Sequence, residues 1–427
     1  MSRICIRNAR LLDSQGERYG ELYLRDGRIE GENLGAAPSE ADCSQIIDAQ
    51  GKLLTPAFID LHVHLRVPGQ EEKEDLASGL AAATAGGYGT IVSMANTSPC
   101  IDQAEQVAEL IHQAEAQGQA RLRPAATLSV GLAGQQLSDF AALQAAGAVM
   151  ITDDGIPVAD SHLMRRACEY ARELGLVIQT HSEDPSLRQA GVMNEGEVSY
   201  RLGLPGNPAS AEAIMIYRDC EIATLTGARV HIAHVSSQRG MQVVEWFKQQ
   251  GAPVSAEVTP QHLTLDDSAL AGFDPIYKVA PPLRSAADVQ YLRAALQRGV
   301  VNNIGTDHAP HTRAEKDRDM LEAPFGITNL EVAFPLLYSR LVRSGLLDLA
   351  TLLEHLQSKA AAVMGWSPPS LAPGEPADVV LLDLEQAHSV DPQRFYSKAK
   401  FSPWAGESLY GWPWATFVRG RLVYQRD

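Results

Sequence analysis

The middle of the chain alternates short apolar stretches with longer amphipathic ones. Eight stretches rich in β-branched and other apolar residues lie at about 57–62, 88–94, 123–130, 148–152, 176–181, 229–234, 254–259 and 301–306. Between most of them, apolar residues recur with helical spacing, as in 74–87, 104–117, 161–175 and 285–299. Strand and helix alternating in this way predict parallel strands joined by crossover helices. Eight such units in roughly 250 to 300 residues favour an α/β fold of the (β/α)8 TIM barrel type.

The two ends of the chain have a different, strand-like pattern. Residues 4–12 and 20–32 alternate apolar and polar positions, and Asp26-Gly27 is a typical two-residue hairpin turn. Residues 377–385 and 416–425 look similar, with a second hairpin expected around Gly420. We therefore expect a small β-sandwich domain built from both ends, residues 1–54 and 366–427, and a barrel over residues 55–365.

The composition of the chain limits the classes of binding partner and the cellular compartment that we expect. The 427 residues carry a formal net charge of −16, which argues against nucleic acid or an anionic membrane as the main partner. The five cysteines are odd in number and far apart, as is typical of a reducing compartment. The first residues lack the apolar core of a signal peptide, and no apolar run is long enough to span a membrane. These features predict a cytoplasmic protein.

Side chains that can bind a metal ion or a substrate stand at the carboxyl ends of several predicted strands. Active sites of such barrels form at the carboxyl ends of the strands. The polar residues there are His62, His64, Arg66, Asn96, Asp153, Asp154, His181, His234, Asp307, His308 and His311. His62 and His64 stand two apart, so they point the same way and can bind one metal ion. His231 is out of register with His234, so we expect it to face the other side and to be structural.

A binuclear metal centre is the interpretation that these residues favour. A single His-x-His is commonly a packing feature and a single Asp-Asp-Gly is commonly a turn. Five strand ends that all carry ligand-type residues are much harder to explain by chance. Four histidines and two carboxylates can hold two divalent ions with a bridging carboxylate. This mixture suits zinc best, with manganese or cobalt as alternatives.

Several motifs are similar to those of type I dihydroorotases, in the amidohydrolase superfamily. They are "DLHVHLRVPG", "THSED", "HIAHVSS", "EVTPQHLTL", "KVAPPLR" and "GTDHAPHTRAEK". The resemblance implies two Zn²⁺ per chain: His62, His64 and Asp307 bind one, His181 and His234 the other, and Asp154 bridges them. Asp153 is the alternative bridge. Hydantoinases use a carboxylated lysine there, and "TDDG" has none, which favours the aspartate-bridged branch.

The same resemblance implies a reaction. It is the reversible cyclisation of N-carbamoyl-L-aspartate to (S)-dihydroorotate and water in de novo pyrimidine biosynthesis. A metal-bound hydroxide is the implied nucleophile, and Asp307 the implied general acid and base. The implied substrate-binding residues are His64, Arg66, Asn96, His311, Phe325 and Gly326. Ala280 and Gln261 depart from the family motifs, and Ala280 replaces an asparagine that contacts the substrate.

Two other functions are compatible with such a barrel. One is a different cyclic amidohydrolase, such as a hydantoinase or allantoinase, against which Arg66 and the missing lysine argue. The other is a non-catalytic scaffold for aspartate transcarbamoylase. Relatives of that kind have lost metal ligands, whereas this chain keeps all six. A homodimer and a complex with aspartate transcarbamoylase are the assemblies that the resemblance suggests.

Overall fold

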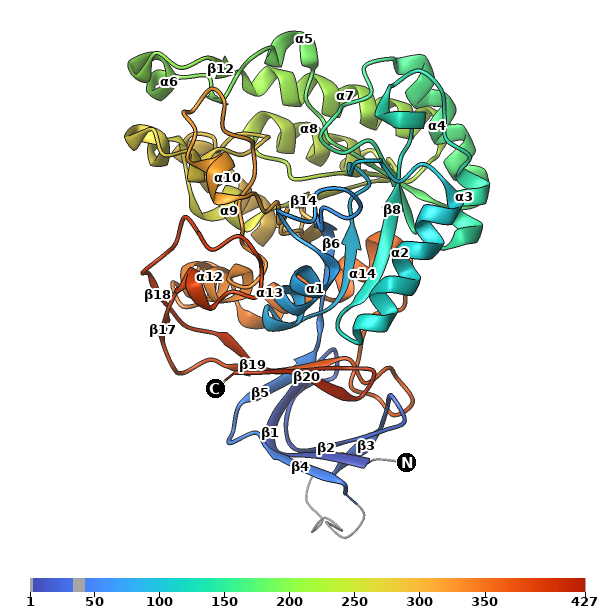
Figure 1. The fold of residues 1–427 in the computed structure, drawn as a ribbon, viewed down its shortest axis with the longest axis vertical. Coiled ribbons are helices and arrows are strands. Elements are labelled where there is room, and N and C mark those ends of the chain that lie inside the picture. The colour runs from blue at the N-terminus through green and yellow to red at the C-terminus, as the bar shows by residue number, and fades with distance from the viewer. Residues whose placement is uncertain (1–2, 34–42, 427) are drawn as a thin grey trace.

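The core of the protein is a barrel of parallel strands. The computed structural model describes residues 3–33 and 43–426. Eight strands pair in the order β15-β14-β13-β10-β9-β8-β7-β6 (Figure 1). Their bounds are β6 (Phe58–Val63), β7 (Tyr88–Ser93), β8 (Arg121–Ala126), β9 (Met150–Thr152), β10 (Val177–Thr180), β13 (Val230–Ile232), β14 (Val254–Val258) and β15 (Asn303–Ile304). Each lies in or overlaps one of the eight predicted stretches.

The barrel closes between its last and first strands, just beyond the end of β15. The amide of His64 donates to the carbonyl oxygen of His308 at 2.8 Å, and the amide of Asp307 donates to the carbonyl oxygen of His62 at 3.0 Å. This pairing brings residues more than 240 positions apart in the chain next to each other. The predicted TIM barrel is confirmed.

Helices cover the outside of the barrel. Their bounds are α1 (Leu76–Ala85), α2 (Ala104–Gln117), α3 (Phe140–Ala146), α4 (Ser161–Leu174), α7 (Ala209–Thr226), α8 (Gln238–Gln249), α10 (Ala286–Gln297), α13 (Leu349–Leu356) and α14 (Ser358–Met364). The four segments predicted to be helical are α1, α2, α4 and α10. Helix α4 shows why such segments can be predicted from the sequence. Asp160 caps its first amides, Gly175 ends it at φ 69°, and Met164 and Ala171 are buried on one face.

Both ends of the chain contribute to a second sheet, which lies at one end of the molecule (Figure 1). Its order is β20-β19-β16-β5-β1-β2-β3, and β4 pairs with β1. The bounds are β1 (Arg3–Asp13), β2 (Gly16–Arg25), β3 (Arg28–Asn33), β4 (Gln45–Asp48), β5 (Leu53–Pro56), β16 (Val379–Asp383), β19 (Trp412–Val418) and β20 (Arg421–Gln425). The hairpins at Asp26-Gly27 and Gly420 are confirmed.

This terminal sheet has its own apolar core, which includes Ile6, Leu22, Leu54, Val379 and Phe417. The division at residues 54/55 and 365/366 stays a prediction, and its first boundary falls within β5, whose Thr55 and Pro56 still pair with β16 of the terminal sheet. Of the residues assigned to the small domain, 1–2, 34–42 and 427 lie outside the part of the chain that the structure describes.

Among the described residues, no helix is long and apolar enough to cross a membrane.

Loops and short elements cover the far end of the barrel. Because β5 leads almost directly into β6, the terminal sheet lies at the amino ends of the barrel strands. The carboxyl ends open on the opposite side, where α5 and α6 lie (Figure 1). The short elements that follow the carboxyl ends of the strands are α5 (Pro185–Arg188), β11 (Met193–Asn194), α6 (Glu197–Leu202), β12 (Gly206–Asn207), α9 (Pro260–Thr264) and α11 (Arg313–Lys316). Three others, α12 (Ala333–Leu337), β17 (His388–Ser389) and β18 (Ser408–Leu409), lie nearer the terminal sheet (Figure 1).

Candidate active site

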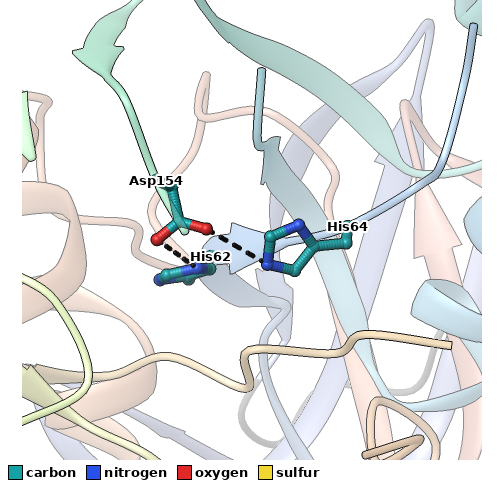
Figure 2. Close-up of side chains that lie close together, drawn as sticks. All are labelled: His62, His64 and Asp154. Atoms are coloured by element: carbon teal, nitrogen blue, oxygen red, sulfur yellow. Dashed lines mark ion pairs between the residues drawn. The ribbon is translucent and has the colours of Figure 1, made fainter. Parts of the chain in front are cut away.

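Four histidines surround one carboxylate at the carboxyl ends of the barrel strands. Asp154, two residues past β9, lies with Oδ1 3.4 Å from Nε2 of His62 and Oδ2 3.4 Å from Nε2 of His64 (Figure 2). On its other side, Oδ1 lies 3.5 Å from Nε2 of His234 and 3.8 Å from Nδ1 of His181. All five side chains are buried. The Asp154 carboxylate is therefore shared by two histidine pairs.

These residues fit a pair of metal ions. Their ligand atoms form two groups, His62 with His64 and Asp154, and Asp154 with His181 and His234. In addition, Nε2 of His62 and Oδ1 of Asp154 are buried without a hydrogen-bond partner among the described residues. Leaving such atoms unpaired is costly unless something binds them. Imidazole nitrogens with a carboxylate are the ligands that zinc commonly takes in proteins.

Asp153 points elsewhere, although it is the neighbour of Asp154. Its Oδ1 accepts hydrogen bonds from the amides of Leu128 at 2.8 Å and Ser129 at 3.0 Å, and its Oδ2 accepts one from the Ser129 hydroxyl. Asp153 thereby fixes the loop after β8. The geometry favours Asp154 over Asp153 as the bridging residue.

Asp307 lies against the first histidine pair. Its Oδ1 is 3.2 Å from Nε2 of His64 and 3.6 Å from Nε2 of His62. Asp307, Arg66 and His234 all have positive φ angles, of 48°, 62° and 34°. Non-glycine residues rarely adopt such conformations, and those that do are concentrated at functional sites. The fold thus holds three predicted site residues in costly backbone conformations.

Buried carboxylates and an amide orient the histidines from behind. Nδ1 of His62 donates to Oε1 of Glu257 at 2.8 Å, and Nε2 of His181 donates to Oε2 of Glu183 at 2.8 Å. Nδ1 of His64 donates to Oδ1 of Asn96 at 2.9 Å. Such partners fix which ring nitrogen faces a metal.

The sequence interpretation missed Glu257 and Glu183. Glu183 follows His181 by two residues in "THSED", so that motif offered a signal. Glu257 lies within β14, and nothing local distinguishes it from an ordinary strand residue. His231 is outside both ligand groups, but the expectation that it faces away is wrong: its Nε2 lies 3.2 Å from Oε2 of Glu257. It therefore supports the carboxylate that holds His62.

Attraction between the histidines and the two carboxylates determines the protonation state of Asp154 and Asp307. Burial alone would raise the pKa of Asp154, but the surrounding histidines hold it well below its usual value. Burial likewise opposes ionisation of Asp307, yet His64, His62 and His234 lower its pKa. Both carboxylates are therefore ionised at neutral pH, the form that binds cations and accepts protons.

A pocket opens beside the cluster. Most predicted site residues line it: His64, Arg66, Asn96, Asp154, His181, His234, Ala280, Asp307, Phe325 and Gly326. The remaining lining residues, Gly155, Arg188 and Ala309, were not predicted. His62 and His311 lie behind the lining. Nε2 of His311 is 2.8 Å from the carbonyl oxygen of Phe325 and 3.2 Å from a terminal nitrogen of Arg66.

Two features shape the wall of this pocket. Burial and the nearby Arg66 lower the pKa of His311 to about 2, so its ring is neutral and can hydrogen-bond without adding charge. Gly326 has φ 146°, and a Cβ there would lie 2.4 Å from the carbonyl oxygen of Ala309. A side chain cannot be accommodated at that point, so backbone alone forms the wall.

Comparison with known proteins agrees with this site. The family model described as "Dihydro-orotase-like" matches residues 51–240. The chain is 52% identical over 411 residues to a dihydroorotase of Deinococcus radiodurans, covering 96% of this chain and 97% of that one. It is 48% identical over 429 residues to a dihydroorotase of Thermus aquaticus, covering 99% of each.

Solved structures show the same fold at lower identity. An L-hydantoinase (dihydropyrimidinase) from Arthrobacter aurescens aligns with a TM-score of 0.87 and 26% identity, covering 100% of this chain and 96% of that one. A dihydropyrimidinase from Brevibacillus agri aligns with a TM-score of 0.85 and 23% identity, covering 99% and 95%. Because the near full-length relatives are dihydroorotases, the chain belongs to the dihydroorotase family.

Proposed function

We infer that the chain is a dihydroorotase that interconverts N-carbamoyl-L-aspartate and (S)-dihydroorotate in pyrimidine biosynthesis. The observation that carries this inference is one carboxylate shared by two histidine pairs, beside a pocket that contains Arg66. The first feature suits activation of water at a cyclic amide. The second suits a substrate with a carboxylate. The similarity to dihydroorotases along nearly the whole chain supports both.

Two zinc ions are the cofactors that we propose. One would be held by His62, His64 and Asp307, the other by His181 and His234, with Asp154 between them. When bound, such ions lower the pKa of water from ~15.7 toward ~7 and polarise a carbonyl oxygen. Glu257, Glu183 and Asn96 would keep three of the histidines in the orientation that ligation needs.

Asp307 is the proposed general acid and base. It is ionised, buried and within 3.2 Å of His64, at the edge of the pocket. In hydrolysis it accepts the proton of the attacking water and delivers it to the ring nitrogen as the amide bond breaks. In cyclisation it accepts the proton of the ureido nitrogen as that nitrogen attacks the side-chain carboxylate, and it delivers this proton to the departing carboxylate oxygen, which leaves as hydroxide and takes up one further proton from solvent to become water.

Arg66 is the proposed anchor for the substrate carboxylate. Its Nε donates to the carbonyl oxygen of Pro310 at 3.1 Å, which fixes the guanidinium in the pocket wall. Its terminal N–H groups can then meet a carboxylate with two parallel hydrogen bonds. Asn96, His311 and the Phe325–Gly326 backbone are the proposed neighbours of the bound substrate.

We expect Arg66→Lys to raise KM for carbamoyl aspartate by about tenfold or more, because lysine keeps the charge but loses the planar fork. Steady-state kinetics in the cyclisation direction measure this. Arg201→Lys, at an exposed position of α6, is the matched control and should leave KM unchanged. An unchanged KM in Arg66→Lys would mean that another group holds the carboxylate.

We expect Ala280→Asn to be tolerated and to lower KM for dihydroorotate by about two- to tenfold. Ala280 lines the pocket at a position where the family motif has asparagine, and alanine cannot donate a hydrogen bond. A restored hydrogen bond contributes roughly 0.5–1.5 kcal/mol. Kinetics with a thermal melt test this. A higher KM at an unchanged melting temperature would show that the pocket is shaped around alanine.

Turnover of dihydroorotate, hydantoin and allantoin by the purified chain separates the candidate activities. We expect dihydroorotate to be strongly preferred, because hydantoin and allantoin carry no carboxylate for Arg66. A preference for either of the other two would overturn the proposal. Absence of any turnover in the metal-loaded chain would favour the scaffold function instead.

The cellular location of the chain and its assembly with other chains are two further proposals. The five cysteines are all free in the structure, which supports a reducing, cytoplasmic location. A homodimer and a complex with aspartate transcarbamoylase are the proposed assemblies. Light scattering of the chain alone, and then mixed with the transcarbamoylase, would test them.

A further inference from the structure

Arg188 brings a second guanidinium to the substrate pocket. It is the last residue of α5, the short helix between β10 and β11, and its side chain is 24% exposed. It lines the same pocket as Arg66, Asn96 and His181. Asp184 fixes the turn that carries it: its carboxylate accepts from the Ser186 amide at 2.9 Å, and its carbonyl accepts from the Arg188 amide at 2.8 Å.

The guanidinium of Arg188 is positioned but makes no hydrogen bond with any described residue. Its Nε lies 3.4 Å from Oε2 of Glu183, is buried, and has no hydrogen-bond partner there. Its Cζ lies 5.1 Å from the centre of the Phe325 ring. The ion pair and the ring contact fix the direction of the side chain. They leave the N–H donors available.

The other buried cations near the pocket each donate a hydrogen bond to a protein atom. Arg66 donates to a carbonyl oxygen of Pro310. Lys278 donates to the carbonyl oxygen of Ala323 at 2.6 Å, and Arg284 donates to Oγ of Ser236 at 3.0 Å. Arg188 therefore differs from Lys278 and Arg284 and resembles Arg66, whose terminal N–H groups face the substrate, in having donors to offer to a ligand.

We propose that Arg188 is a second cationic contact for the substrate and that it favours the dianionic one. This rests on the proposed dihydroorotase function. Carbamoyl aspartate carries two carboxylates and dihydroorotate carries one. The Coulomb attraction to a fixed positive charge scales with the ligand charge, so a cation that faces the pocket should help the dianion more. Arg188 would thereby bias binding toward the open-chain substrate.

A purely structural role for Arg188 predicts a different result. Glu183 also holds His181, so the ion pair of Arg188 with Glu183 could act only by orienting that histidine. Loss of this support would change metal content and kcat. It would change KM for the two substrates equally. The two roles therefore differ in measurable ways.

The test compares Arg188→Gln and Arg188→Lys with the parent chain, and uses Arg201→Gln as the exposed control. For Arg188→Gln we expect KM for carbamoyl aspartate to rise about tenfold and KM for dihydroorotate about threefold. The kcat values, metal content and melting temperature should stay close to those of the parent. Arg188→Lys keeps the charge, so its KM values for carbamoyl aspartate and dihydroorotate should both stay closer to those of the parent than the values of Arg188→Gln do.

Equal KM values for parent and Arg188→Gln would overturn this inference alone, provided that the parent turns over both substrates. A loss of kcat and metal without a difference between substrates would also overturn it, in favour of the structural role. A parent chain that turns over neither substrate would overturn the proposed function and this inference together. If Arg188→Gln fails to fold, Arg188→Ala, which also removes the charge, takes its place: a KM change for carbamoyl aspartate that is no larger than for dihydroorotate would contradict the proposal.

Discussion

Replacing Asp307 with asparagine is expected to reduce turnover by about 10²–10⁴-fold in both directions while the fold survives. The amide is nearly isosteric with the carboxylate, so the backbone bond between Asp307 and His62 should persist. It cannot accept and release a proton at neutral pH, however. Its oxygen is also a weaker metal ligand, so some loss of metal is expected beside the loss of proton transfer.

The measurement is kcat with saturating zinc, together with metal content and a thermal melt. Asp139→Asn is the matched control, because Asp139 caps α3 and asparagine caps a helix equally well. It should leave kcat unchanged. An Asp307→Asn variant that keeps most of its activity when loaded with metal would remove Asp307 from the proposed proton transfer.

Replacing Asp154 with alanine should have the largest effect on metal binding. Asp154 Oδ1 and Oδ2 are the atoms shared by both histidine pairs, so neither metal position is complete without them. We expect metal content to fall from about two ions to fewer than one per chain. Turnover should fall by roughly 10³-fold or more, since bound ions contribute several kcal/mol to such reactions.

The neighbouring Asp153→Ala variant is the control for this prediction. Asp153 accepts hydrogen bonds from Leu128 and Ser129, so its loss should destabilise the fold by about 1–3 kcal/mol and leave metal content unchanged. Metal analysis and melting curves of both variants give the comparison. If Asp153→Ala lost the metal and Asp154→Ala kept it, the assignment of the bridge would be reversed.

Much of the fold could be predicted because the barrel repeats one simple pattern. Each strand is a short apolar stretch and each helix buries one face, so local spacing was enough to find the eight barrel strands and helices such as α4. The terminal sheet was predictable for a related reason, since Asp26-Gly27 and Gly420 mark its hairpins. Closure of the barrel then followed from the number of units.

The site was only partly predictable, for physical reasons. His62 and His64 lie on a strand, where alternation determines the facing side. Asp153 and Asp154 lie beyond the end of β9, where alternation no longer holds, so the choice between them required the tertiary structure. Arg188 comes from an excursion between β10 and β11 that no barrel pattern describes, and only the folded chain brings it beside Phe325.

We expect the chain to be active only when this cluster holds two metal ions. The most direct test is to remove all metal from the purified protein and to measure dihydroorotate turnover as zinc is added back in known equivalents. We predict negligible activity at the start and a rise that levels off at about two ions per chain. Full activity in protein that contains no more than trace metal would contradict the account.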